Sequence, residues 1–155
     1  MTYNEMSALI QRSVCVSLGY TDEAGRQNIR RVFCPSHKGL GGHLISTNTS
    51  SAHVQSLLNN DNACLYFSDD SVFEGLCLSG RAIVHFDREY KAFLWAEGDE
   101  KYYPQGVEDE DYCVIEFVAE SGRFYKGDSS NYKGDLSKQE IEAWDTGKVY
   151  TDRKS

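Results

Sequence analysis

Apolar and polar residues alternate in several short runs of this chain, a period of two that is typical of β-strands with one buried face. The runs at 13–20 and 28–34 flank the turn 21–25, whose glycine can take a positive φ, and together they predict a β-hairpin. Gly80 lies inside the longest run, where a bulge or a barrel corner is expected. Further strands are predicted at 43–48, 62–69, 73–86, 112–121 and 122–127, and a glycine-rich loop at 35–42.

Other segments space their apolar residues three and four positions apart, which is the period of an amphipathic helix. Residues 4–12 form one such segment, and residues 49–61 form another, which begins with serines suited to cap a helix. Two more helices are predicted at 87–98 and 136–144. Because only one helix separates early neighbouring strands, a repeated βαβ sheet is not expected. The pattern predicts a mainly β fold, a predominantly antiparallel barrel with peripheral helices.

Length and charge narrow the class of protein. A chain of 155 residues suits one domain, which we place at 1–127, and residues 128–155 form a polar tail with one short helix. The net charge of −8 excludes a general binder of nucleic acid or of anionic membranes, because both need a positive surface. No apolar run reaches the roughly 18–20 residues of a membrane span, and the N-terminus lacks the pattern of a signal peptide, so a cytoplasmic protein is expected.

Cysteine and histidine spacing indicates no metal chemistry. The five cysteines form no CxxC pair, and four of them lie inside apolar runs, where a reduced cysteine behaves as a small hydrophobic side chain. The histidines at 37, 43, 53 and 85 show no spacing typical of metal ligands. We therefore predict buried, reduced cysteines and no metal site.

Two polar features are candidates for anion binding. Arg30 and Arg31 are neighbours in a predicted strand, so one of them points toward the core or a cleft and needs an anionic partner there. The alternative is that both lie at an edge and reach water. Residues 46–51, STNTSS, run from a strand end into a helix start, where free N–H groups suit a phosphate. Ordinary helix capping is the alternative for this segment.

A third candidate is the aromatic group Trp95, Tyr102 and Tyr103. Such side chains stack on flat ligands, and they equally fill core or interface space. No side chain in the sequence stands out as a catalytic acid or base, so the catalytic residues are not predicted.

Four segments in this order resemble the pyridoxamine 5'-phosphate oxidase-like FMN-binding split-barrel family, and most closely its general stress protein 26-like branch. The resemblance spans about residues 6–127. The segments are GRQNIRRVF (25–33), LISTNTSSAHVQSLLNNDNACLYFSD (44–69), FEGLCLSGRAIV (73–84) and LWAEGDEKYYPQGVEDEDYCVIEF (94–117).

The resemblance implies a six-stranded antiparallel split barrel that forms a homodimer and binds FMN at the subunit interface. It places Arg30 on the flavin, the strand end around Ser46 and Thr47 along the flavin, and the turn from Ser51 to His53 at the phosphate. By the same resemblance Val32 and Asn48 are cofactor-binding residues, and Trp95 and Tyr102 line a substrate pocket.

Two departures from the family pattern bear on function. Relatives commonly carry Lys or Arg where this chain has Ala52 and His53, so protonation of His53 is expected to strengthen flavin binding as the pH falls from about 8 to 6. The lysine that the oxidases proper carry after the second strand falls near Pro35, which argues against true pyridoxamine 5'-phosphate oxidase activity.

The expected function is therefore an FMN-dependent oxidoreductase-like protein whose redox centre is the flavin ring. The substrate and the electron donor are not predicted. The alternatives are a non-enzymatic flavin-binding stress protein, or a relative of the same fold that binds haem or a deazaflavin.

Overall fold

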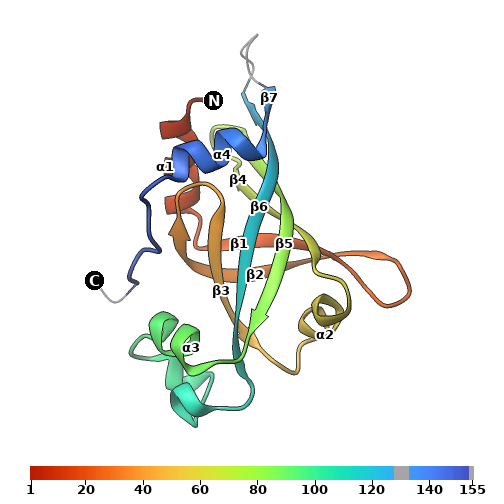
Figure 1. The fold of residues 1–155 in the computed structure, drawn as a ribbon, viewed down its shortest axis with the longest axis vertical. Coiled ribbons are helices and arrows are strands. Elements are labelled where there is room, and N and C mark those ends of the chain that lie inside the picture. The colour runs from red at the N-terminus through yellow and green to blue at the C-terminus, as the bar shows by residue number, and fades with distance from the viewer. Residues whose placement is uncertain (128–132, 154–155) are drawn as a thin grey trace.

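The computed structural model describes residues 1–127 and 133–153. Six antiparallel strands, in the order β3-β2-β1-β4-β5-β6, close into a barrel where β3 pairs with β6 (Figure 1). This confirms the predicted mainly β fold with a six-stranded antiparallel barrel. The barrel strands are β1 (Cys15–Thr21), β2 (Gln27–Lys38), β3 (Gly42–Asn48), β4 (Asn62–Asp69), β5 (Glu74–His85) and β6 (Tyr112–Lys126). A seventh strand, β7 (Lys133–Leu136), pairs with β6 outside the barrel.

The long strands β5 and β6 bend around the barrel. Their pairing shifts register between Ser79 and Gly80, which confirms the expected irregularity at this glycine. A Cβ at Gly80 would collide with the carbonyl oxygen of Val118, so only glycine fits this close approach. The two strands predicted at 112–121 and 122–127 are one continuous strand, β6, because the bend replaces a turn.

The second strand also differs from the prediction. A loop was expected at 35–42, yet β2 continues to Lys38, and its pairing with β3 is irregular between Phe33 and Ser36. As a result Cys34, Ser36 and His37 are all buried, although side chains at odd spacing would normally face opposite sides.

Four helices lie around the barrel in the described part of the chain, together with the short 3-10 turns η1 (Asp99–Lys101) and η2 (Gly106–Glu108). They are α1 (Tyr3–Arg12), α2 (Ala52–Asn59), α3 (Arg88–Leu94) and α4 (Lys138–Asp145). Thr2 and Glu5 form a reciprocal capping box at the start of α1. The helix predicted at 87–98 ends early, at Leu94, and Trp95 is already extended. None of the described helices is long and apolar enough to cross a membrane.

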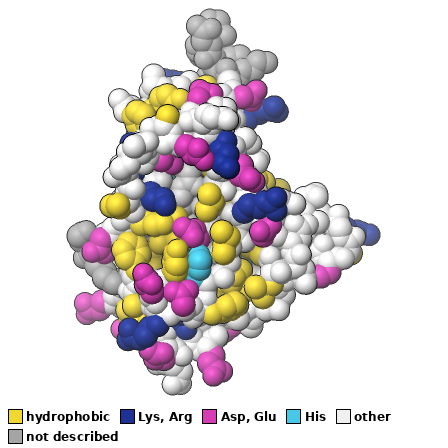
Figure 2. Space-filling model, in the orientation of Figure 1, with side chains coloured by type: hydrophobic (Ala, Val, Ile, Leu, Met, Phe, Trp, Pro, Cys, Tyr) yellow, Lys and Arg dark blue, Asp and Glu magenta, His cyan; other side chains and the backbone are white. Residues whose placement is uncertain are grey.

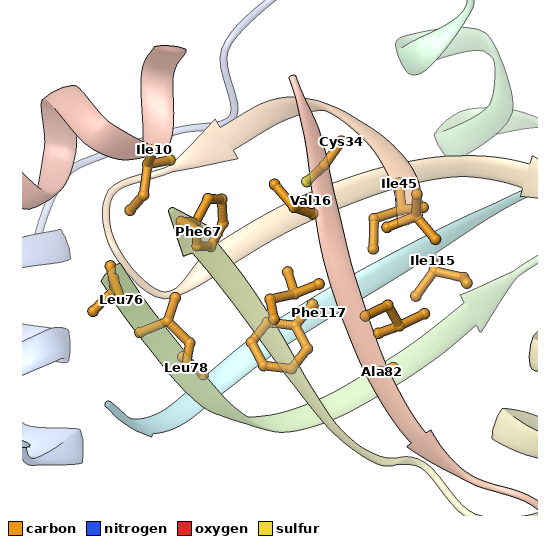
Figure 3. Packing of buried hydrophobic residues seen from close by; sticks show 14 of the residues in the cluster. Ile10, Val16, Cys34, Ile45, Phe67, Leu76, Leu78, Ala82, Ile115 and Phe117 are labelled. Atoms are coloured by element: carbon orange, nitrogen blue, oxygen red, sulfur yellow. The ribbon is translucent and has the colours of Figure 1, made fainter. Parts of the chain in front are cut away.

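The main core fills the barrel, and a smaller cluster lies under α3. Figure 3 shows side chains such as Val16, Ile45 and Phe117 converging from different strands on the barrel interior. The smaller cluster contains Leu44 and Tyr112 and packs against Trp95.

The C-terminal segment packs on the barrel more closely than its polar composition suggests. Strand β7 extends the sheet beside β6, and Leu136 and Ile141 are buried in the main core. The Asp145 carboxylate accepts hydrogen bonds from the backbone N–H groups of Leu40 and Gly41, at 2.7 and 2.8 Å. Part of the segment predicted as a tail, residues 128–132 and 154–155, lies outside the described residues.

Candidate cofactor-binding site

The end of β3 presents consecutive side chains to opposite sides of the sheet. Thr47 is buried on the inner side, where it contacts His53, while Ser46 and Asn48 line a cleft on the outer side. This alternation follows from the period of two along a strand. The predicted site residues of segment 46–51 are therefore divided between two places, an inner cluster and an outer cleft.

The inner cluster consists of the buried Thr47 and His53 together with Arg30, which is itself exposed and covers His53. Arg31 is exposed as well, so neither arginine points into the core. An Arg30 Nη1–H group donates to His53 Nδ1 at 3.0 Å, since a guanidinium has only donors. His53 therefore carries its proton on Nε2, which lies 2.9 Å from Thr47 Oγ1 and donates to it. The structure thus brings together three residues that the sequence analysis assigned to the cofactor.

Burial decides the charge of His53. Desolvation, and then the positive charge of Arg30, lower the pKa of His53 to about 4. This pKa keeps the imidazole neutral between pH 6 and 8, which argues against the expected gain of flavin affinity from protonation of His53 in this range. Burial causes most of this pKa shift, and the extent of burial could not be read from the sequence.

A carboxylate lies against the turn that precedes α2. Asp111, the residue before β6, accepts hydrogen bonds from Asn48 Nδ2 and from the Ser50 backbone N–H, each at 2.8 Å. These bonds lower the pKa of Asp111, so it is negatively charged at neutral pH. Ser51 is the N-cap of α2 but makes no capping bond with its side chain. Two donors of the predicted polar segment 46–51, directly before the expected phosphate turn, are therefore already used by an anion.

The outer cleft has a volume of about 550 Å³ and lies between β3, β2 and the segment that follows α3. Ser46, Phe33 and Tyr102 line it, and Tyr102 is 66% exposed. On another side Arg153 lies over the Phe33 ring and forms an ion pair of 3.0 Å with Asp99. The remaining lining residues are Cys15, Asn48, Glu97, Gly98, Lys101 and Tyr103.

Ser46 carries the strongest sign of a ligand in this cleft. Its Oγ is buried yet has no hydrogen-bond partner in the described structure. A buried hydroxyl without a partner is costly, and a ligand that supplies one removes this cost. The aromatic walls and the few polar groups fit a flat, partly polar molecule such as a flavin ring.

Two predicted site residues lie elsewhere. Val32 points into the main core, and Trp95 packs against Tyr103 and Tyr112 in the smaller cluster. Neither lines the outer cleft. Sequence reasoning also missed Arg153 and Asp111, because each reaches the site from a distant part of the chain and no local pattern marks it.

Comparison with known proteins gives the family. The model of the pyridoxamine 5'-phosphate oxidase-like family matches residues 34–147. A protein from Clostridium acetobutylicum related to general stress protein 26 of Bacillus subtilis, described as of the pyridoxine phosphate oxidase family, is 37% identical. Its crystal structure superposes with a TM-score of 0.80 over 90% of this chain and 96% of that one. The chain therefore belongs to the pyridoxamine 5'-phosphate oxidase-like family, as the resemblance indicated.

Two further solved structures share the fold at lower identity. A haem-binding protein from Mycobacterium smegmatis is 16% identical, with a TM-score of 0.72 over 91% of this chain and 60% of that one. An FMN-binding protein from Nostoc punctiforme, described as related to pyridoxamine 5'-phosphate oxidase, is 11% identical, with a TM-score of 0.59 over 85% of this chain and 93% of that one. No curated protein sequence matches the chain.

Proposed function

We propose that this protein binds FMN in the outer cleft and acts as an oxidoreductase through the flavin ring. The observation that carries the proposal is the buried Ser46 Oγ, without a described partner, in a cleft walled by Phe33 and Tyr102. Membership of the family supports it, and so does the FMN-binding relative from Nostoc punctiforme.

Different residues of the chain would bind the ring and the phosphate of FMN. Ser46 and Asn48 offer hydrogen bonds to the polar edge of the ring, and Tyr102 offers an aromatic face. Arg30 touches the first turn of α2 through His53 and supplies a permanent positive charge for the phosphate. Because Asp111 occupies the neighbouring turn, we expect the phosphate to contribute less affinity than it would at a turn bearing lysine.

The flavin itself supplies hydride and electron transfer, and the protein's part is to position the ring and tune its electrostatic surroundings. The five cysteines are free in the structure, which fits the reducing cytosol where we place the protein.

We further propose that the protein is a homodimer. Ile83, Phe86 and Val118 are 41%, 49% and 40% exposed on and just beyond the neighbouring strands β5 and β6. Figure 2 shows hydrophobic side chains gathered on this face of the molecule. An exposed apolar patch on a β-sheet is typical of a protein interface.

Sedimentation should give a dimer at about 10 µM with FMN present, and Ile83→Glu should shift it toward the monomer. A monomeric native chain under these conditions would contradict the proposal.

The test of the function is the identity of the bound group. Purified protein should show flavin absorption, and mass spectrometry of the denatured protein should find FMN in the supernatant. The test variant is Ser46→Phe, which fills the cleft and should release the flavin while the far-ultraviolet circular dichroism stays unchanged. Turnover of reduced nicotinamide with an electron acceptor would separate an enzyme from a storage protein.

Haem is the second candidate, favoured by the exposed Cys15 thiol at the cleft and by the haem-binding structural relative. A cysteine thiolate is one of the side chains that ligate haem iron. A Soret band in place of the flavin spectrum, lost in Cys15→Ser, would replace the FMN proposal.

A further inference from the structure

A cluster of three potential metal ligands lies at the other end of β3 from the proposed flavin cleft. Cys34 and His37 come from β2, and His43 comes from β3. The Cys34 Sγ atom and one ring nitrogen of each histidine lie within 4.8 Å of one another. Cys34 and His43 are fully buried, and His37 is nearly so. The spacing rules used on the sequence predicted no metal site and missed this cluster.

The irregularity in β2 assembles the cluster. Cys34 and His37 are three residues apart, so a regular strand would point them to opposite faces. The shift in pairing between Phe33 and Ser36 turns both side chains inward. His43 pairs with His37 across the β2–β3 ladder and completes the group.

The histidines are oriented as metal-binding histidines commonly are. His43 Nε2–H donates to the Leu40 carbonyl at 2.7 Å, which leaves the lone pair of Nδ1 directed into the cluster. That atom lies 2.9 Å from His37 Nδ1. A hydrogen bond between two Nδ1 atoms requires a lone pair on one of them, so at least one imidazole is neutral.

Access to the cluster comes from a second cleft, with a volume of about 600 Å³. Cys34 and His37 line it, and its opposite walls are α1 and residues 147–151. Two of the three ligands therefore face a route from solvent, which a metal site requires. His43 lies deeper, against the rings of Phe67 and Phe117.

The charge balance selects the ion. Thiolate and imidazole ligands suit Cu(I) and Zn(II). One thiolate and two neutral imidazoles leave a net charge of zero around Cu(I), but a charge of +1 around Zn(II). A net charge is costly in an apolar interior. The three members of the cluster include no carboxylate to offset it.

We propose that Cys34, His37 and His43 form a buried site for one Cu(I) ion. Binding replaces the S–H bond of Cys34 with an S–Cu bond and releases one proton to solvent. The proton shared between the two Nδ1 atoms moves to Nε2 of His37, and both Nδ1 atoms then coordinate the ion. Ligand bonds of about 2.0–2.3 Å, as zinc makes, require the three atoms to approach within about 4 Å, so the cluster contracts slightly on binding.

Another pair of cysteines determines how the test is designed. Cys64 and Cys77 contact each other on β4 and β5 and could hold Cu(I) through two sulfur atoms. The experiment therefore uses the full chain carrying Cys64→Ser and Cys77→Ser. Cu(I) is titrated without oxygen against a chromogenic Cu(I) chelator, and X-ray absorption reports the ligands. We expect one ion per chain, bound by one sulfur and two nitrogen atoms.

Variants then locate the ion. In the same background Cys34→Ser should weaken Cu(I) binding by at least about 100-fold, the upper range for loss of a mere outer-shell partner. The matched control is Cys113→Ser, which alters another fully buried cysteine outside the cluster and should leave the affinity unchanged. If Cys34→Ser does not fold, X-ray absorption of the Cys64→Ser, Cys77→Ser protein still tests the proposal, because it counts the sulfur and nitrogen atoms bound to the ion. Failure to compete with the chelator, a ligand set without nitrogen, or tighter binding of Zn(II) than of Cu(I) would overturn the proposal.

Discussion

The two sides of the β3 end differ in how their polar groups are satisfied. On the inner side Arg30, His53 and Thr47 bond to one another and form a closed chain. On the outer side the Oγ atom of Ser46, next to Thr47 in sequence, is buried without a described partner. Polar groups that satisfy one another stabilise the fold, whereas a buried group without a partner marks a place for a ligand. We therefore expect changes at Thr47 and His53 to alter stability and changes on the outer side to alter binding, while Arg30, which we assign to the phosphate, should affect both.

Removing residues 128–155 should lower the stability of the protein more than any other change proposed below. The deletion takes Arg153 from the outer cleft, and it also takes Leu136 and Ile141 from the core, where each such side chain is worth about 2–5 kcal/mol. We expect the free energy of unfolding, measured by urea denaturation, to fall by at least about 4 kcal/mol. Arg153→Ala is the control, because it opens the cleft and spares the core. A truncated chain as stable as the full one would show that the tail is dispensable.

The second largest effect should be a loss of folding stability in acid, caused by the buried histidines. The pKa values of His37 and His53 are lowered to about 4 and that of His43 to about 3, chiefly by desolvation, from 6.5. Below pH 6.5 the unfolded chain binds these protons and the folded chain does not. Stability is therefore complete above pH 6.5 and falls as the pH drops toward 4, by up to about 1.4 kcal/mol per pH unit for each histidine.

Urea denaturation of metal-free protein at pH 7, 6 and 5 measures this slope. His53→Gln should reduce it by about a third, since it removes one of the three groups. Equal stability at pH 7 and pH 5 would mean that these side chains are not buried as described.

Ser46→Phe should separate binding from stability. The larger side chain fills the outer cleft, so FMN affinity should fall at least tenfold, or about 1.4 kcal/mol. The melting temperature should change less than the affinity, because no other described side chain bonds to the Ser46 hydroxyl and the ring can extend into the open cleft. Isothermal titration and a thermal melt measure the two effects. Ser68→Phe, at an exposed position on β4 away from this cleft, is the matched control and should keep full affinity.

Arg30→Ala should give the smallest effect and tests whether the inner side also serves the ligand. Loss of the donor to His53 Nδ1 should cost about 1 kcal/mol of unfolding free energy. If Arg30 also meets the phosphate, the affinity for FMN should fall about tenfold and that for riboflavin should not change. Titration of both ligands from pH 6 to 8 should give flat profiles. Equal affinities of FMN and riboflavin for the native chain would show that the phosphate lies elsewhere.

Local patterns predicted most elements and part of the site. The segment 62–69 is a strand with the predicted bounds, and the helix at the N-terminus begins one residue earlier than expected. Both are short segments with a clear period, bounded by turn or capping residues. The loop expected at 35–42 was wrong for its first half, because pairing with β3 keeps Pro35 to Lys38 extended. Such pairing depends on a partner strand and leaves no periodic signal.

By itself the sequence determined the barrel class and marked Arg30 and the polar segment 46–51 as candidates for binding, because hydrophobic period and residue chemistry are local properties. Only the tertiary structure decided on which side of the sheet each polar side chain lies and what it contacts. It keeps His53 neutral by burial, sets Asp111 against the turn, and brings Arg153 to the cleft from the far end of the chain. It also gathers Cys34, His37 and His43 through an irregular strand. Burial, strand register and contact between distant segments arise from the whole fold, and no single segment carries them.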